Sequence, residues 1–418
     1  MTASNLPTKK MHVDTRLLHA DRLSKPEHGA VHKPLHTSST YSYDRAEDLV
    51  AVFQGSQAGY IYARQGNPTT TALEQQITLL EQGTATASFA TGMAAITAVF
   101  ISLLRSGDHV VSSQFLFGNT NSLLQTMEAF GVQFSFVDAT DAAQVAAAIQ
   151  ANTRMVFVET IANPRTQVAD LLGIGELCAK HQLVYVVDST LTTPILLKPK
   201  SIGASLVVHS LTKSISGHGN AMGGSVTDTG LYDWSKYPHI YESYKKGPPS
   251  TWGILQVKKK GLRDMGATLR SEDAHRISVG AETMRLRVPA ASHNALQVAQ
   301  FLEGHPGIGR VYYPGLASHE QHERSLQLFS GHFGTLLSFE LKPEYDTLAF
   351  LNRLKIVILS SHLSDTRSLA IPVAQTIYWE MGADKRHAMG IADGLIRLSV
   401  GIEALEDLLE DLSQALSQ

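Results

Sequence analysis

The sequence has only one cysteine, Cys178, among its 418 residues. A single thiol can neither form a disulfide within the chain nor complete a cysteine-based metal site, so a disulfide-stabilised secreted fold is excluded. An excess of positive charge is also lacking, because 35 Lys and Arg face 38 Asp and Glu. Since a long polyanion is held mainly by positive charge, nucleic acid is not an expected partner.

Long apolar segments are scarce as well. Only residues 85–104 are long and uncharged enough to suggest a membrane span, yet they include Ser88, Thr91 and Gly92. We therefore predict a buried strand, a loop and a helix in this segment, and no membrane association. The opening residues MTASNLPTKKMHVDTRLLHADR lack the apolar core of a signal peptide, which predicts a cytoplasmic protein.

A metal-binding motif is also missing. The chain has 18 histidines, but His319 and His322 in SHEQHER do not have the H-E-x-x-H spacing. We expect these two histidines to lie at the surface, and we predict no metal site.

The sequence does contain short β-branched segments that alternate with amphipathic stretches from about Asp108 to Val226. The expected strands are 109–113, 133–138, 155–160, 183–188 and 205–210. This alternation is typical of a mainly parallel sheet covered by helices, so the fold class is α/β. In such sheets ligands bind at the carboxyl ends of the strands.

The pattern changes after Gly261, where a long helical stretch precedes a second group of strands. The expected strands are 336–341, 356–361 and 395–400, and a closing helix begins near Ala404. Leu405, Leu408, Leu409, Leu412 and Leu416 recur at the helical period and predict a packing face. We expect an N-terminal arm over residues 1–62, a main domain over 63–265 and a smaller α+β domain over 266–418.

Asp188 and Lys213 form a chemically informative pair. Asp188 closes one expected strand, and Lys213 follows the next one. Parallel strands end at the same edge of a sheet, so both side chains can face one crevice. Pyridoxal phosphate (PLP) requires a lysine that holds its aldehyde as a Schiff base and a carboxylate that keeps its ring nitrogen protonated. Either residue alone would be an ordinary surface or turn residue, but together they predict a PLP site.

Two further groups are suited to a phosphate. Ser210 and Thr212 place hydroxyls just before the lysine. Gly92 and Met93 lie where a glycine-containing loop enters an expected helix, and the free N–H groups of a helix N-terminus attract anions. Both groups are therefore candidate phosphate ligands.

Several separate segments together resemble one family. They are YARQGNPT (62–69), FATGMAAI (89–96), FVETIANP (157–164), VVDST (186–190) and HSLTKSISGHGNAMGG (209–224). In this order they are similar to the Cys/Met-metabolism PLP-dependent enzymes, and the resemblance runs from about His36 to the C-terminus. The family includes cystathionine γ-synthase, cystathionine lyases, methionine γ-lyase and O-acylhomoserine sulfhydrylases. It implies the aspartate-aminotransferase-like fold (fold type I), a small amino-acid substrate, and a homodimer as catalytic unit within a homotetramer.

The resemblance also implies a role for each matching residue. Lys213 would form the Schiff base, and Asp188, with Thr190 beside it, would face the ring nitrogen. The phosphate would be held by Ser210, Thr212, Gly92 and Met93, and by Tyr62 and Arg64 from the neighbouring subunit. Phe117 would stack on the cofactor ring. On the substrate side, Arg397 would bind the α-carboxylate, and Asn163, Glu159 and His362 would lie near it.

Some positions depart from the family pattern. Phe117, in FLFGNT, replaces the usual tyrosine, so its ring can stack but has no hydroxyl for proton transfer. Asn119 stands where methionine γ-lyases commonly have cysteine, and His362 lies in an altered substrate loop. The segment GGSVTDTGLYDWSKYPHIYESY (223–244) resembles an insertion of O-acetylhomoserine sulfhydrylases.

We therefore predict γ-replacement on an activated homoserine, as in cystathionine γ-synthase or an O-acylhomoserine sulfhydrylase. The alternative is a γ-lyase that eliminates the γ-substituent of cystathionine, methionine or an analogue. A non-catalytic PLP-binding protein would not need Lys213, Asp188 and Arg397 together.

Overall fold

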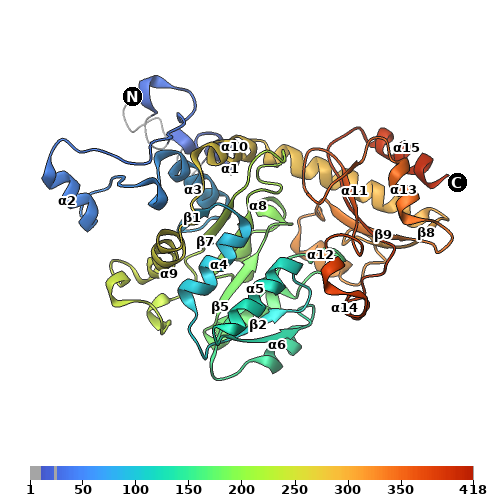
Figure 1. Cartoon of the computed structure of the whole chain (residues 1–418), viewed down its shortest axis with the longest axis horizontal. Helices are drawn as coiled ribbons and strands as arrows, with labels where there is room; N and C mark the ends of the chain where they lie inside the picture. Colours follow the sequence, from blue (N-terminus) through green and yellow to red (C-terminus); the bar gives the residue numbers. More distant parts are fainter. Residues whose placement is uncertain (1–10, 23–25, 418) are drawn as a thin grey trace.

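The computed structural model describes residues 11–22 and 26–417, so part of the expected arm, residues 1–10 and 23–25, lies outside the described residues. The chain forms two β-sheets joined by long helices, and an N-terminal arm projects from the body (Figure 1). Each sheet falls within one of the expected domain ranges, 63–265 and 266–418, although the boundaries themselves stay a prediction.

The larger sheet has seven strands in the order β1-β7-β6-β5-β4-β2-β3. Their bounds are β1 Ala85–Phe89, β2 His109–Ser113, β3 Gln133–Val137, β4 Thr153–Glu159, β5 Val184–Asp188, β6 Leu206–Ser210 and β7 Gly224–Asp228. Strands β3, β2, β4, β5 and β6 pair in parallel, whereas β7 is antiparallel to both of its neighbours. The predicted mainly parallel α/β fold is confirmed.

Strand β7 was not predicted, because its start at Gly224 follows a glycine-rich segment typical of a loop. The structure gives the physical reason for this glycine. A Cβ atom at Gly224 would lie 2.1 Å from the carbonyl oxygen of Thr91. Only glycine allows β7 to approach the loop before α4 so closely.

Helices cover both faces of this sheet. They are α3 Pro68–Glu81, α4 Gly92–Leu103, α5 Gly118–Ala129, α6 Ala142–Ala148, α7 Leu171–His181, α8 Thr193–Leu196 and α9 Trp252–Gln256. Successive residues of β5 enter different cores, since Tyr185 and Val187 belong to one apolar cluster and Val184 and Val186 to another. A strand that is buried on both faces does not need alternating polar and apolar residues. This explains why the strands of this sheet appear in the sequence as continuous apolar segments.

Residues 85–104 form β1 and α4, so the predicted strand, loop and helix are confirmed. Within the described ranges, none of the helices combines the length and the apolar character that a membrane crossing requires.

The smaller sheet has the order β10-β11-β12-β9-β8. Its strands are β8 Ile308–Tyr312, β9 Leu336–Leu341, β10 Ile358–Leu359, β11 Leu369–Pro372 and β12 Leu395–Ser399. Helices α10 Ser271–Glu282, α11 Met284–Gly304, α12 His322–Leu328, α13 Thr347–Arg353, α14 Ala383–Ala388 and α15 Leu405–Leu416 accompany it. In α15 the packing face is confirmed, because Leu408, Leu412 and Leu416 are buried and Leu405 and Leu409 pack beside them.

Two predictions about this region were wrong. The expected strand 356–361 pairs only at residues 358–359, and the strands β8 and β11 were missed. His319 and His322 do not stand free at the surface. Both are partly buried, with hydrogen-bonding contacts to Thr166 and to the carbonyl oxygen of Pro314.

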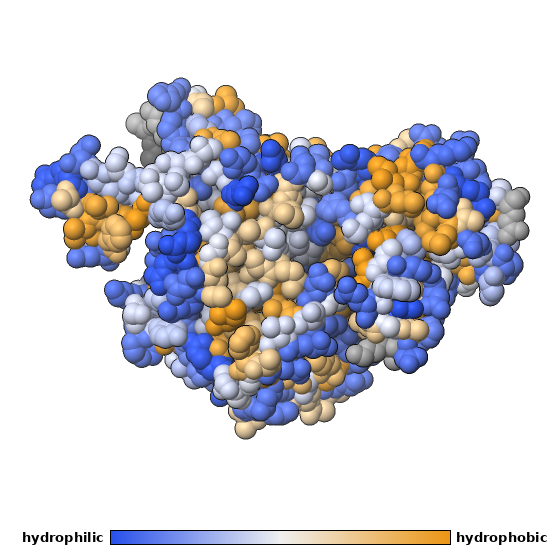
Figure 2. Space-filling view, in the orientation of Figure 1, coloured by the Kyte–Doolittle hydropathy of each residue, from blue (hydrophilic) through white to orange (hydrophobic). Residues whose placement is uncertain are grey.

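The described part of the arm includes the α-helices α1 Val13–Leu18 and α2 Ala46–Gln54. Helix α1 lies against α3 and buries Leu17. Helix α2 projects away from the body (Figure 1), and its apolar residues Val50 and Phe53 are 50% and 64% exposed. Figure 2 shows this apolar surface in orange on the projecting helix.

Candidate active site

A cavity of about 550 Å³ lies at the carboxyl ends of β4, β5 and β6, and residues of the smaller sheet also line it. Its lining includes every predicted site residue except Tyr62, Arg64 and His362. The predicted residues that line it are Gly92, Met93, Phe117, Glu159, Asn163, Asp188, Thr190, Ser210, Thr212, Lys213 and Arg397. The sheet edge therefore brings together residues that lie far apart in the sequence.

Asp188 and Glu159 end neighbouring strands and are paired in register. The backbone N–H of Thr190 donates to Asp188 Oδ1 at 2.9 Å, and that of Phe117 donates to Glu159 Oε1 at 2.8 Å. Burial, followed by the charge of Asp188, raises the pKa of Glu159 to about 8. Burial also raises the pKa of Asp188, but its hydrogen bonds with Thr190 favour the charged form. Of these two carboxyl groups, Asp188 is therefore the one whose charged form is better stabilised.

Lys213 sits in the turn that follows β6, where its backbone N–H donates to the carbonyl oxygen of Ser210 at 3.1 Å. Its amine faces the cavity, and Nζ lies 3.3 Å from Nδ1 of His362. Burial, followed by the positive charge of Arg397, lowers the pKa of Lys213 to about 8. An amine with this pKa is partly neutral near physiological pH and can act as a nucleophile or base.

The N-terminus of α4 closes one end of the cavity. Its N-cap Thr91 accepts a hydrogen bond from Ala94 N–H at 3.0 Å, while the first amides of a helix have no partner in a preceding turn. A Cβ atom at Gly92 would lie only 2.8 Å from Cβ of Ser210. Because Gly92 has no side chain, the first amides of α4 and the Ser210 hydroxyl can face the same small space.

Thr212 completes this corner, because its Oγ1 accepts a hydrogen bond from Gly223 N–H at 3.0 Å and is held in place. The donors in this corner are those that bind a phosphate group in many proteins. The residues present therefore fit a phosphorylated ligand whose other end reaches Asp188 and Lys213.

Arg397 lies in β12 and is only 2% exposed. Its Nη2 donates to the carbonyl oxygens of Ser361 and His362 at 2.7 and 3.1 Å, and Nη1 lies 3.5 Å from Oδ1 of Asn163. These contacts hold the guanidinium in the cavity wall, oriented for a carboxylate. Tyr378, which the sequence analysis missed, donates to the carbonyl oxygen of Asn163 at 2.9 Å. No motif in the sequence marks this tyrosine.

Several residues that line the cavity were also missed. They are Thr91, Ile96, Thr120, Ile161, Leu191, Met222, Ser361, Leu363 and Ile377. Thr91 could have been found, because a threonine before a glycine-led helix is a typical N-cap.

Tyr62 and Arg64 do not reach the cavity of their own chain. Tyr62 is 44% exposed, and the Arg64 guanidinium lies over its ring at 5.5 Å. Arg64 also donates to the carbonyl oxygen of Arg263. Their position outside the cavity is consistent with the expected action on a neighbouring subunit, which stays a prediction.

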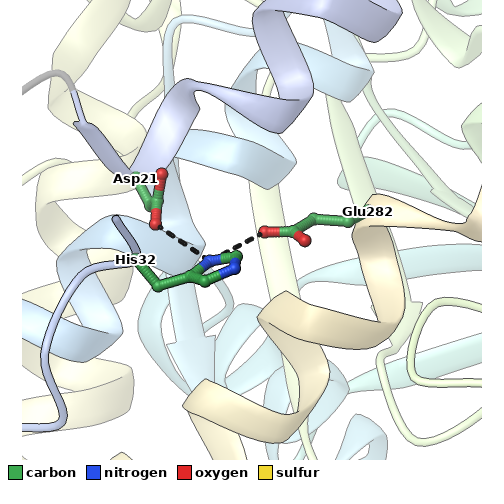
Figure 3. Close-up of side chains that lie close together, drawn as sticks. All are labelled: Asp21, His32 and Glu282. Carbon is green, nitrogen blue, oxygen red and sulfur yellow. Dashed lines mark ion pairs between the residues drawn. The ribbon is translucent and has the colours of Figure 1, made fainter. Parts of the chain in front are cut away.

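A separate acidic and histidine cluster joins the arm to α10 (Figure 3). Nδ1 of His32 lies 3.7 Å from Asp21 Oδ2 and 3.6 Å from Glu282 Oε1. None of the three residues lines the cavity, and Asp21 also accepts a hydrogen bond from the backbone N–H of Lys33. We interpret the cluster as ion pairs that fasten the arm, and the absence of a metal stays a prediction.

Comparisons with known proteins agree with this site. The family described as Cys/Met metabolism PLP-dependent enzyme matches residues 14–417. L-methionine gamma-lyase of Fusobacterium nucleatum subsp. polymorphum is 38% identical over 99% of this chain and 100% of its own length. O-succinylhomoserine sulfhydrylase of Pseudomonas aeruginosa is 36% identical over 97% of this chain and 95% of its own length.

A solved structure supports the same conclusion. A putative O-acetylhomoserine (thiol)-lyase from Campylobacter jejuni has a TM-score of 0.92 and 31% identity, covering 98% of this chain and 100% of its own. That structure contains a lysine joined to a pyridoxyl monophosphate group. The fold and the cavity thus define a fold type I PLP-dependent enzyme.

The chain belongs to the Cys/Met metabolism PLP-dependent enzyme family. The predicted family, cofactor and enzyme class, a carbon–sulfur lyase or a transferase, are confirmed.

Proposed function

We propose that PLP is held by the residues at the carboxyl ends of β5 and β6. Lys213 is the attachment residue, and Asp188 faces the ring nitrogen. Ser210, Thr212 and the first amides of α4, at Gly92 and Met93, bind the phosphate. The observation that supports this placement is the close approach of Gly92 to Ser210, which forms a phosphate-sized corner within reach of Lys213.

When bound, PLP withdraws electrons from the substrate α-carbon, so that its hydrogen becomes acidic. Lys213 then removes this proton, because burial lowers its pKa to about 8 and so keeps part of the amine neutral. Asp188, whose charged form is favoured by its hydrogen bonds with Thr190, is the group that would keep a proton on the ring nitrogen. Phe117, fixed by Glu159 through its backbone N–H, packs over the ring, and Thr190 holds the Asp188 carboxylate in position.

Arg397 and Asn163 bind the substrate carboxylate. The Arg397 guanidinium is already oriented by the carbonyl groups of the loop at 361–362, so little side-chain freedom is lost on binding. We infer an α-amino acid substrate because Lys213, Asp188 and Arg397 line the same cavity.

The reaction we propose is γ-replacement on an activated homoserine. The cavity is also lined by the apolar side chains of Met222, Leu363 and Ile377, beside which a thiol can approach the γ-carbon. The sulfhydrylase relative and the O-acetylhomoserine (thiol)-lyase structure support this choice. The segment 223–244 gives no support, because it does not line the cavity and its Trp234 is buried in the core.

A second candidate is γ-elimination, which the 38% identity to an L-methionine gamma-lyase favours. The two reactions share the removal of the γ-substituent and differ in the group that attacks afterwards. A thiol adds to the γ-carbon in replacement, whereas water releases a 2-oxo acid and ammonia in elimination.

One assay separates the two candidates. The purified holoenzyme is given O-acetylhomoserine, O-succinylhomoserine, cystathionine or methionine, each with and without cysteine or sulfide, and the products are identified by mass spectrometry. Replacement predicts a thioether product that requires the thiol. A 2-oxo acid formed equally fast with and without thiol would instead establish a γ-lyase.

We also propose a homodimer as the catalytic unit, paired into a homotetramer, in a cytoplasmic location. The exposed apolar residues Val50 and Phe53 of α2, and the exposed Tyr62 near Arg64, support a subunit contact on the arm. Co-expressed Arg64→Ala and Lys213→Ala chains test this arrangement. If Arg64 acts on the partner's site, hybrid dimers have one intact site, and an equal mixture regains about a quarter of wild-type activity. No recovery in hybrid dimers would contradict it.

A further inference from the structure

A second cavity, of about 200 Å³, lies between β8 and the segment that follows β4. Its charged lining residues are Arg165 from that segment, and Glu303, Arg310 and Glu320 from α11, β8 and the loop after β8. None of the residues that line this second cavity lines the cavity of the proposed PLP site. The second cavity is therefore a separate candidate site for a ligand.

Arg165 has unused hydrogen-bonding capacity at the wall of the second cavity. Among the described residues, its guanidinium donates one long hydrogen bond, from Nη1 to the carbonyl oxygen of Met389 at 3.4 Å, and forms no ion pair. Its Nε is buried without a hydrogen-bond partner in the described part of the chain. A guanidinium carries five N–H donors, so most donors of Arg165 are left for a ligand. A carboxylate is a suitable ligand group, because it can accept two of these hydrogen bonds.

The Tyr312 ring positions this guanidinium. The central carbon of Arg165 lies 4.9 Å from the centroid of the Tyr312 ring. The ring is itself held, because the Tyr312 hydroxyl donates to Glu340 Oε1 at 2.7 Å. Stacking on an aromatic ring uses the flat face of a guanidinium, and the N–H groups at its edge stay available. Arg165 is therefore ordered before a ligand binds.

The other charged residues of the lining can be assigned in turn. Arg310 and Glu320 neutralise each other, since Nη2 of Arg310 lies 3.4 Å from Oε1 of Glu320. His319 is neutral at neutral pH, because burial lowers its pKa to about 4. Among the described residues that line the second cavity, the charges that remain are those of Arg165 and Glu303.

Glu303 supplies a negative charge to balance that of Arg165. Its Oε1 accepts a hydrogen bond from the Ser318 hydroxyl, and its side chain forms no ion pair within the described ranges. A ligand that satisfies both Arg165 and Glu303 must carry a carboxylate and a cationic group. The zwitterion of an α-amino acid carries both groups on one carbon atom.

The size and the remaining lining of the second cavity limit the ligand further. A volume of about 200 Å³ corresponds to about seven water molecules. Ile308, Val311 and Tyr312 add apolar surface to the charged groups. An amino acid with a short aliphatic side chain suits this combination of size, charge and apolar surface.

We propose that the second cavity is a binding site for a small aliphatic α-amino acid. Arg165 binds the carboxylate of this ligand, and Glu303 binds its ammonium group. The inference goes beyond the proposed function, because it assigns a second ligand site that takes no part in the reaction at Lys213. The substrate and product of the proposed reaction are themselves α-amino acids, so their concentration would determine how far the second site is filled.

Titration calorimetry with L-2-aminobutyrate tests the proposal. The holoenzyme is first reduced with borohydride, so that the amine of this probe cannot form a Schiff base with the cofactor. We expect one binding site per chain, with a Kd of about 1 mM. In Arg165→Gln and in Glu303→Gln we expect the affinity to fall about 10- to 100-fold, because each change removes a hydrogen bond between charged groups.

Arg353→Gln is the matched control for Arg165→Gln. Arg353 is likewise partly buried and donates to a backbone carbonyl oxygen, that of Ala415 at 2.8 Å, but it lies outside both cavities. Butyrate and propylamine each lack one charged group of the probe, and we expect both to bind at least about 10-fold more weakly. If Arg165→Gln does not fold, Glu303→Gln carries the same test at an exposed residue.

Affinity that stays unchanged in Arg165→Gln or in Glu303→Gln would overturn the proposal, as would butyrate that binds as tightly as 2-aminobutyrate. Arg397→Lys distinguishes the two cavities. Unchanged binding in this variant would place the probe outside the PLP site, whereas loss of binding would place it there and contradict the proposal. Because the titration measures no reaction, failure of the proposed function would leave its outcome unchanged.

Discussion

Replacing Arg397 with lysine tests how the substrate carboxylate is bound. Lysine keeps the positive charge but not the planar fork, so it cannot hold both loop carbonyls and a carboxylate together. A hydrogen bond to a charged group contributes about 1.5–3 kcal/mol. Loss of one such bond therefore predicts a rise in KM of about 10- to 100-fold, with a smaller fall in kcat.

The assay measures kcat and KM for the amino-acid substrate in the wild type and in Arg397→Lys. Arg310→Lys is the matched control, because Arg310 lies in β8 of the same sheet, is exposed and is not part of the cavity. Near-ultraviolet circular dichroism checks that the fold is retained. A rise in KM of Arg397→Lys below about threefold would refute the role of the guanidinium as a carboxylate clamp.

Three further changes test the cofactor residues. Asp188→Asn cannot hold the ring proton, and we expect kcat to fall about 100- to 1,000-fold in steady-state assays. Gly92→Ala places a methyl group 2.8 Å from Cβ of Ser210, so we expect a loss of about 1–3 kcal/mol in urea unfolding and weaker cofactor binding in titrations. In the cofactor-free protein, acetylation of Lys213 should have its midpoint near pH 8, and a midpoint near pH 10.5 would contradict its burial. The unfolded chain binds the Lys213 proton more tightly than the folded chain does, because burial lowers the pKa of Lys213 from 10.5 to about 8. The free energy of unfolding should therefore rise between pH 8 and 10.5, and Lys213→Met should remove this rise.

Most of the main sheet and its cofactor residues could be predicted from the sequence. Buried parallel strands appear as continuous apolar segments, and their last residues, such as Asp188 and Ser210, necessarily meet at one edge. Strand β7 could not be predicted in the same way. It is antiparallel, begins at Gly224, and exists because that glycine permits a close approach to Thr91.

The proposed substrate side of the site, around Arg397 and Asn163, depends on packing between the two sheets. Sequence patterns do not encode this packing. Arg397 was predicted only through the family resemblance, and Tyr378 was missed, because neither has a local signal. Both residues contact Asn163, which lies more than 200 residues earlier in the chain. Such long-range contacts are fixed by the fold as a whole.

The contacts of Arg397 connect the proposed carboxylate site with the surroundings of the Lys213 amine. The same guanidinium that is placed to bind the substrate carboxylate also holds the carbonyl oxygens of Ser361 and His362. A substitution at Arg397 therefore also acts on the loop that sets the 3.3 Å contact between His362 Nδ1 and Lys213 Nζ. The proposed carboxylate site and the surroundings of the Lys213 amine thus share one structural element. In the cofactor-free protein, Arg397→Lys should consequently move the acetylation midpoint of Lys213 to lower pH, because the loop that holds the His362 imidazole against the amine loses its guanidinium contact.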